Sequence, residues 1–189
     1  MSYAWRLYLV DPDAVLAELR SPTLNWDDVG DLELAEEIAD EDDWPDLQAD
    51  VAGQLRDAGD EVELDGDGGD YLWLVVNALA GDPVVEAEYS SGAGDWFRDQ
   101  VLGALTPAIG ADSVTHLVER ALGPIRPVPF PVHGWLNTDE VQTAVAGLNA
   151  TGPIIVDDDN EDTESPAEDV EQIVHALRQA TSGVFTITA

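Results

Sequence analysis

Residues Trp5 to Val10 read Trp-Arg-Leu-Tyr-Leu-Val, and this stretch decides the fold class. Its side chains alternate with the period of two that is typical of a β-strand, placing Trp5, Leu7 and Leu9 on one face. The opposite face carries Tyr8 and Val10, so both faces are largely apolar. The pattern predicts that the chain opens with a strand.

The other end of the chain has a similar apolar character. Val184 to Thr188 reads Val-Phe-Thr-Ile-Thr, which predicts a second strand. Because both strands are apolar and terminal, we expect them to be neighbours in one small sheet. Helical patterns dominate the sequence between them, so the sequence predicts an α+β fold in which mostly helices pack on this sheet.

Several helices between the two strands have clear start and stop signals. Asp11 and Pro12 provide a cap and a first-turn proline for a helix that ends near Arg20. The segment 45–58 has an apolar stripe at helical spacing, and Ser165 with Pro166 predicts the start of the last helix.

Two apolar segments are harder to assign. Residues 71–80 are apolar all round and fit either a buried helix or a central strand, although Gly81 and the leucine and alanine content favour a helix. The run Ile154 to Val156 predicts a short strand.

The length of 189 residues is sufficient for one domain with a sizeable core. No linker divides the chain, so we expect a single acidic domain over residues 1–189 with an acidic loop at 157–164. No apolar run approaches the roughly 20 residues that span a bilayer. The first residues lack the features of a secretory signal, which predicts a cytoplasmic protein.

Negative charge is the most pronounced property of the sequence. Forty Asp and Glu residues stand against seven Arg and no Lys, for a formal net charge of -33. The arginines are scattered singly, whereas nucleic-acid binding needs clustered cations, so nucleic acid is excluded as a partner. Anionic membrane surfaces are disfavoured for the same reason.

The acidity has three competing interpretations. The first is adaptation of a housekeeping domain to high intracellular salt, which fits charges spread from end to end. The second is a surface that meets a basic protein, as in an immunity protein covering the cationic site of a toxin. The third is mimicry of the DNA backbone. The two functional interpretations both require a concentrated patch of carboxylates.

Our leading hypothesis is a non-enzymatic, immunity-like or regulatory interaction protein that binds a basic partner. Its candidate contacts are two carboxylate-rich loops, which comprise Asp42, Asp43, Trp44, Asp157, Asp158 and Asp159. The hypothesis rests on the charge together with the absence of the usual catalytic motifs. The absence of cysteine also removes thiolate metal sites and thiol chemistry.

A proline-rich arm supports an alternative function. The segment 126–135 combines Arg126, His133 and Trp135 with a stiff backbone, as at the rim of a pocket for a small ligand or in a metal-dependent enzyme. The same arm also fits a structural connector whose aromatic side chains anchor it to the core, and we favour this interpretation.

One histidine and one carboxylate have the spacing of half a metal site. His116 and Glu119 are three residues apart on a helix predicted over 112–122. A complete site needs a second such pair, so a solvent-facing pair is favoured. We expect no metal, no cofactor and no catalytic residue.

The order of elements resembles the uncharacterised bacterial families related to the YfbM-like proteins. The resemblance rests on the strand after Tyr3, the helix after Pro12, the Trp-bearing apolar helix from Trp73 to Gly81, and the proline-rich arm leading into Trp135. It implies an α+β single domain and carries over no catalytic residue. The acidic run at 157–164 departs from the family pattern.

Overall fold

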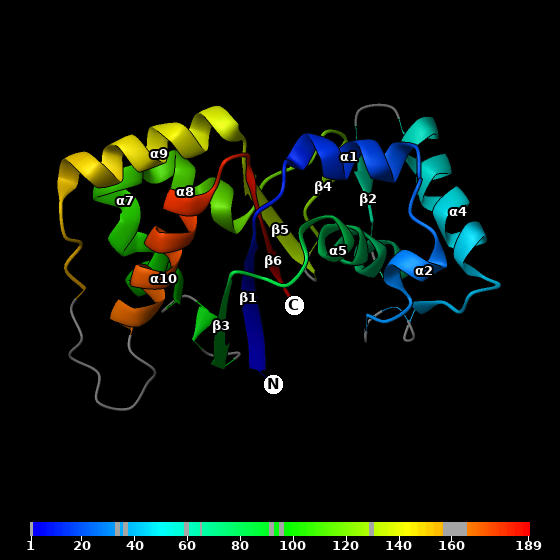
Figure 1. Cartoon of the computed structure of the whole chain (residues 1–189), viewed down its shortest axis with the longest axis horizontal. Coiled ribbons are helices and arrows are strands. Elements are labelled where there is room, and N and C mark those ends of the chain that lie inside the picture. Colours follow the sequence, from blue (N-terminus) through cyan, green and yellow to red (C-terminus); the bar gives the residue numbers. More distant parts are fainter. Residues whose placement is uncertain are drawn as a thin grey trace.

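The first and last strands of the chain lie side by side in the middle of an antiparallel sheet (Figure 1). The computed structural model describes residues 2–32, 35, 38–58, 61–64, 66–90, 93–94, 97–128, 131–156 and 166–189. The strands follow the order β3-β1-β6-β5. Their bounds are β1 (Ser2–Tyr8), β3 (Val85–Ser90), β5 (Val132–Leu136) and β6 (Val184–Thr188). The predicted pairing of the terminal strands is confirmed.

Both faces of the central strands are buried, as the alternation in β1 requires. Trp5 and Leu7 enter the hydrophobic core on one side of the sheet, and Tyr8 enters the core on the other. In β6, Val184 belongs to the first core and Phe185 to the second. The sheet therefore separates two apolar cores, and each core needs its own layer of helices.

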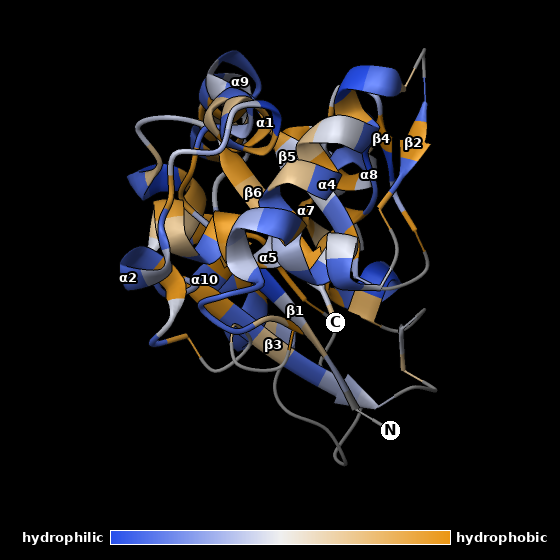
Figure 2. Ribbon diagram, turned by 90° about the vertical axis from the view of Figure 1, so that its right-hand side faces the viewer, coloured by the Kyte–Doolittle hydropathy of each residue, from blue (hydrophilic) through white to orange (hydrophobic). Residues whose placement is uncertain are grey.

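The helices cover the two faces of the sheet in two separate groups (Figure 1). One group and the short strands beside it comprise α1 (Pro12–Arg20), α2 (Trp26–Val29), α4 (Trp44–Asp57), β2 (Val62–Glu63), α5 (Asp67–Ala80) and β4 (Ile125–Arg126). The other comprises η1 (Phe97–Leu102), α7 (Gly103–Ile109), α8 (Ala111–Val118), α9 (Thr138–Thr151) and α10 (Pro166–Gln179). The α+β prediction is confirmed. Figure 2 shows the apolar strands β5 and β6 enclosed by helices that carry both apolar and polar residues.

Local sequence signals placed several helices correctly. The Asp11 side chain accepts a hydrogen bond from the backbone N–H of Asp13 at 3.0 Å, which caps α1, and Pro12 is the first helical residue. The apolar segment 71–80 lies within α5, which ends at Gly81 with a φ of 78°. Glycine adopts this conformation without steric cost, so the choice of helix over strand is confirmed.

Two predicted elements differ from the structure. Residues 154–156 form no strand, because Gly152, with a φ of 81°, and Pro153 end α9, and Ile154 and Val156 then pack onto the core. The helix expected over 112–122 stops at Val118, since Glu119 is already extended. Extended backbone at this point lets the Arg120 N–H donate to the carbonyl oxygen of His133 at 3.0 Å.

Helices α7 and α9 cross so closely that one contact position excludes any side chain. A Cβ atom at Gly147 would overlap the backbone carbonyl oxygen of Ala108. Gly53, in α4, has no atom within 4 Å of the corresponding position. The two helical glycines therefore differ in surroundings and offer a matched pair.

We expect Gly147→Ala to lower the free energy of unfolding by about 2 kcal/mol, because α7 and α9 must move apart. Gly53→Ala should raise it by about 0.5 kcal/mol, since alanine favours the helix and meets no obstacle. Urea unfolding of both variants measures the two changes. A Gly147→Ala variant as stable as Gly53→Ala would contradict the close crossing.

Candidate interaction surface

One end of the molecule carries a continuous excess of carboxylates. Between Arg20 and Arg56 the sequence contains no Arg, Lys or His. Its carboxylates are Asp27, Asp28, Asp31, Glu33, Glu36, Glu37, Asp40, Glu41, Asp42, Asp43, Asp46 and Asp50. All of these that the structure describes, which excludes only the three glutamates at 33, 36 and 37, are exposed on and around α2 and α4. We call this set of described carboxylates the acidic end.

No cation of the described residues pairs with a carboxylate of the acidic end. Within the described part of the chain, the ion pairs are Arg6 with Glu86, Arg126 with Glu61, and Glu140 with Arg120 and His116. None of them involves the acidic end. Its negative charge is therefore available to a partner.

The turn before α4 is held in shape by one of its own carboxylates. Asp40 Oδ1 accepts hydrogen bonds from the backbone N–H groups of Asp42 and Asp43, each at 3.0 Å. This arrangement leaves the side chains of Asp42 and Asp43 exposed. Two of the predicted contact residues thus lie on a fixed turn at the surface.

Trp44, the third predicted contact residue in this loop, is only 2% exposed. Its ring packs edge-on against Trp26 at 6.0 Å and against Tyr71 at 5.3 Å between ring centroids. The side chain therefore anchors the turn to the core and is not available for direct contact with a partner. Burial of such a large aromatic ring stabilises the fold, which explains why this acidic loop contains a tryptophan.

Buried polar groups connect this turn to the segment before α2. The carboxylate of Glu18 accepts hydrogen bonds from the backbone N–H groups of Thr23, at 2.6 Å, and Leu24, at 2.8 Å. Gln48 and Trp44 both donate to the Leu24 carbonyl oxygen, at 2.7 and 3.4 Å. The acidic end thus rests on a hydrogen-bonded scaffold, which sequence patterns alone did not reveal.

The second predicted loop contributes the other three candidate contact residues. Asp157, Asp158 and Asp159 lie outside the described residues. Their part in an interaction surface stays a prediction.

The residues of the proline-rich arm have separate partners. Arg126 pairs with Glu61 beside the short strands β2 and β4. Trp135 donates its indole N–H to the Ala121 carbonyl oxygen at 3.1 Å and lies under the guanidinium of Arg120, at 3.5 Å. His133 is 2% exposed and stacks on Phe185 at 6.0 Å between ring centroids. These contacts match the structural connector that the sequence favoured.

Arg120 and Glu140, which the sequence did not identify as candidate site residues, form a hydrogen-bonded ion pair at the edge of the sheet. Arg120 donates to Glu140 Oε2 at 2.6 Å and to the Trp135 carbonyl oxygen at 3.2 Å. The same carboxylate accepts the Asn137 N–H at 2.9 Å and completes a capping box for α9. Burial would raise the pKa of Glu140, but the hydrogen bonds and charges of these neighbours hold it below its usual value. The Asn137-to-Glu140 spacing was the available sequence signal.

His116 and Glu119, whose spacing matches half of a metal site, do not lie on one helix. Glu119 follows the end of α8, and His116 instead lies beside Glu140, with 3.5 Å between Nδ1 and Oε1. Among the described residues there is no group of three or more potential metal ligands.

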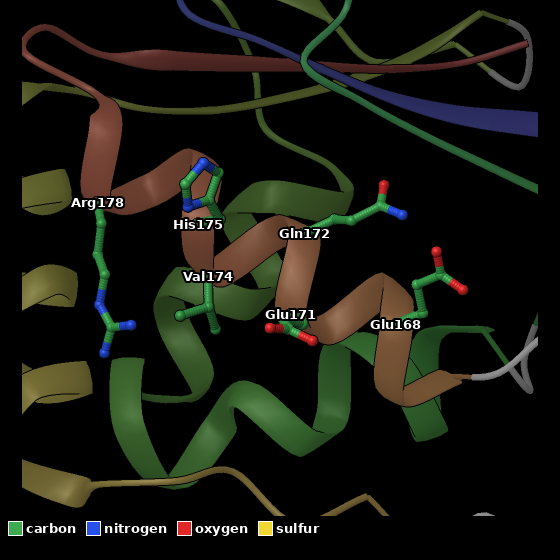
Figure 3. Close-up of a pocket in the computed structure, with 6 residues that line it drawn as sticks. All are labelled: Glu168, Glu171, Gln172, Val174, His175 and Arg178. Atoms are coloured by element: carbon green, nitrogen blue, oxygen red, sulfur yellow. The ribbon is translucent and has the colours of Figure 1, made fainter.

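Helix α10 borders a shallow hollow of about 380 Å³ that includes His175 and Arg178. Figure 3 shows that the side chains lining it leave successive turns of one helix and extend in different directions. The closest polar contact of His175 is with Gln179, at 2.7 Å. The hollow therefore lacks the convergent polar groups of a catalytic site.

Comparisons with family models, curated proteins and solved structures found no match for this chain. The resemblance to the YfbM-like families therefore stays a prediction. In the described part of the chain, no helix has the length and apolar character needed to cross a membrane.

His133 provides a test of the buried arm. Neither ring nitrogen has a hydrogen-bond partner among the described residues, and burial lowers the pKa of the imidazole from 6.5 to about 4. Between these values the unfolded chain binds more protons than the folded chain, so stability falls as the pH decreases through this window. The effect is absent well above pH 6.5.

We expect the stability of His133→Leu relative to the natural chain to increase by about 2 kcal/mol between pH 7.5 and pH 5, because leucine binds no proton. Urea unfolding of both chains at the two pH values measures this change, and the titration of all other groups cancels in the comparison. A difference that stays constant with pH would contradict a neutral, buried ring.

Proposed function

We propose that this chain is a non-enzymatic interaction protein, of an immunity-like or regulatory kind, that binds a basic protein through its acidic end. The observation that carries the proposal is a surface of exposed carboxylates, none ion-paired within the described residues, over a stretch with no cation between Arg20 and Arg56. Such a surface suits a partner with clustered Arg and Lys side chains.

The physical basis is electrostatic attraction before contact and pre-organisation after it. A surface of one sign accelerates association with a surface of opposite sign and disfavours acidic competitors. The Asp40 hydrogen bonds and the buried Trp44 hold the turn in one conformation. Little conformational entropy is then lost when a partner binds.

Charge-neutralised variants test the location of the surface. Glu41→Gln, Asp42→Asn, Asp43→Asn and Asp46→Asn remove four charges from the acidic end and leave the turn-forming Asp40 in place. The matched control, Glu63→Gln, Asp82→Asn, Glu88→Gln and Asp99→Asn, removes four exposed charges elsewhere. The natural chain first captures a basic protein from a native lysate at low salt, and association kinetics are then measured with each variant.

We expect the acidic-end variant to bind the captured protein with an association rate at least about tenfold lower, and the control to stay near the natural value. Added salt should slow association with the natural chain, because screening shortens the range of attraction. An equal loss in both variants would contradict a localised surface. Failure of the natural chain to capture any basic protein would refute the proposal.

The response of stability to salt tests how far the charges repel one another. Because the carboxylates of the acidic end are unpaired within the described residues, we expect the melting temperature to rise with KCl into the molar range. A gain of about 2 kcal/mol would correspond to about 4 to 8 °C for a chain of this size.

Thermal melts in KCl, with an uncharged osmolyte as the control for solvent exclusion, measure the effect. A flat response would show that the charges are compensated locally. It would also remove the interpretation of the acidity as adaptation to salt.

A further inference from the structure

Two segments of this acidic chain carry no charge at all. Residues 100–111 and 141–156 contain no Asp, Glu, Arg, Lys or His, although charged residues make up 25% of the sequence. The first covers the end of η1 and all of α7. The second runs along α9 from Val141 and continues to Val156.

The two segments pack against each other at one end of the molecule. Gly147 of α9 lies directly on the backbone of Ala108 in α7. In Figure 1, α7 and α9 lie at the end of the long axis opposite α2 and α4. The uncharged segments are therefore far from the acidic end.

The uncharged surface of α9 is exposed to solvent, unlike other charge-free parts of the chain. The charge-free residues of α5 and β6 are largely buried in the core. In contrast, the exposed residues of the second segment are Gln142, Thr143, Ala146, Asn149, Ala150, Thr151, Gly152, Pro153 and Ile155. We call this set the neutral face.

The neutral face includes both an apolar projection and an apolar groove. Ile155 is 90% exposed, the highest value among the large hydrophobic side chains of the described residues. Beside it, an open groove of about 570 Å³ runs between the end of α9 and α10. Leu148, Ile154 and Val174 are among the side chains that line the groove. An exposed large apolar side chain next to an apolar groove is typical of a contact surface.

We infer that the neutral face is the surface through which two copies of this chain associate. Two molecules that each carry a net charge of -33 repel each other strongly, and contact through α2 and α4 would oppose carboxylate to carboxylate. Contact through the residues of the neutral face brings together positions that carry no charge and keeps α2 and α4 of the two copies apart.

The chemistry of the face selects a second copy over a basic protein. Cations of a basic partner would find no carboxylate among the residues of the neutral face, and in the groove Glu171 shares the lining with Arg178, so they would be desolvated with little compensation. A second copy supplies Ile155 for the groove and a groove for Ile155, which fits a two-fold symmetric contact. Glu171 and Arg178 are the charged side chains in the lining of the groove, and the neutral face beside it carries none; depletion of charge is typical of the core of an interface.

Sedimentation at low and high salt tests this inference. At about 1 M KCl, where the screening length is about 3 Å, we expect the natural chain at about 100 µM to form a dimer. At low salt, where repulsion is less screened, we expect the dimer to dissociate. Ile155→Asp should weaken the dimer at least about tenfold, and Ala150→Asp on α9 should do the same. Circular dichroism spectra confirm that the variants are folded.

Val84→Asp provides the matched control. Val84 is 43% exposed and directly precedes β3, whereas the neutral face consists of residues of α9 and the segment after it, so this variant should dimerise as the natural chain does. A natural chain that stays monomeric at high salt would refute the inference. Equal weakening by Val84→Asp and Ile155→Asp would also refute it. Loss of a captured foreign protein in Ile155→Asp, with a monomeric natural chain, would assign the face to another partner.

Discussion

The pairing of β1 with β6 is the interaction on which the rest of the structure depends. Trp5 lies opposite Thr188 and Tyr8 opposite Phe185, so the two ends of the chain are joined at the centre of the sheet. Because both faces of these strands are apolar, neither layer of helices could be omitted without exposing part of a core. The pairing of β1 with β6 closes a loop that contains all the described helices. Formation of the sheet thus unites the two helical layers in one cooperative fold.

The same arrangement explains how the charge becomes asymmetric. Each helical layer presents its outer surface at one end of the long axis (Figure 1). The layer with α2 and α4 carries the acidic end, where no cation interrupts the carboxylates between Arg20 and Arg56. In the other layer, the segments 100–111 and 141–156, which include all of α7 and most of α9, contain no charged residue. Folding therefore converts a charge that is spread along the chain into an acidic end and a neutral face. The two surfaces differ in what they can bind, because one attracts cations from a distance and the other is limited to short-range contact.

The sequence was sufficient for elements whose signals are local. The alternation at 5–10, the Asp11 cap and the Gly81 stop each depend on neighbouring residues, and each was found in the structure. The candidate sites were less predictable, because their geometry depends on contacts between distant residues. Trp44 is buried by Trp26 and Tyr71, and Arg126 is separated from His133 and Trp135 because β4 and β5 belong to different sheets. The ion pair between Arg120 and Glu140 forms because α8 ends four residues before the predicted end of this helix, and no capping residue signals that end.

The exposed positions that lack charge bear on the origin of the acidity. A chain adapted only to salt has no reason to leave the exposed residues of α9 after Glu140 uncharged, since every surface helix could carry solvated carboxylates. At exposed positions such as Ala146 and Ala150, replacement by glutamate would cost only about a few tenths of a kcal/mol in helix propensity. The absence of charge there, beside an apolar groove and an exposed isoleucine, is therefore more informative than the abundance of charge elsewhere. Adaptation to salt would account only for the average composition, whereas the proposed contact between copies of the chain would also account for the positions at which that composition is interrupted.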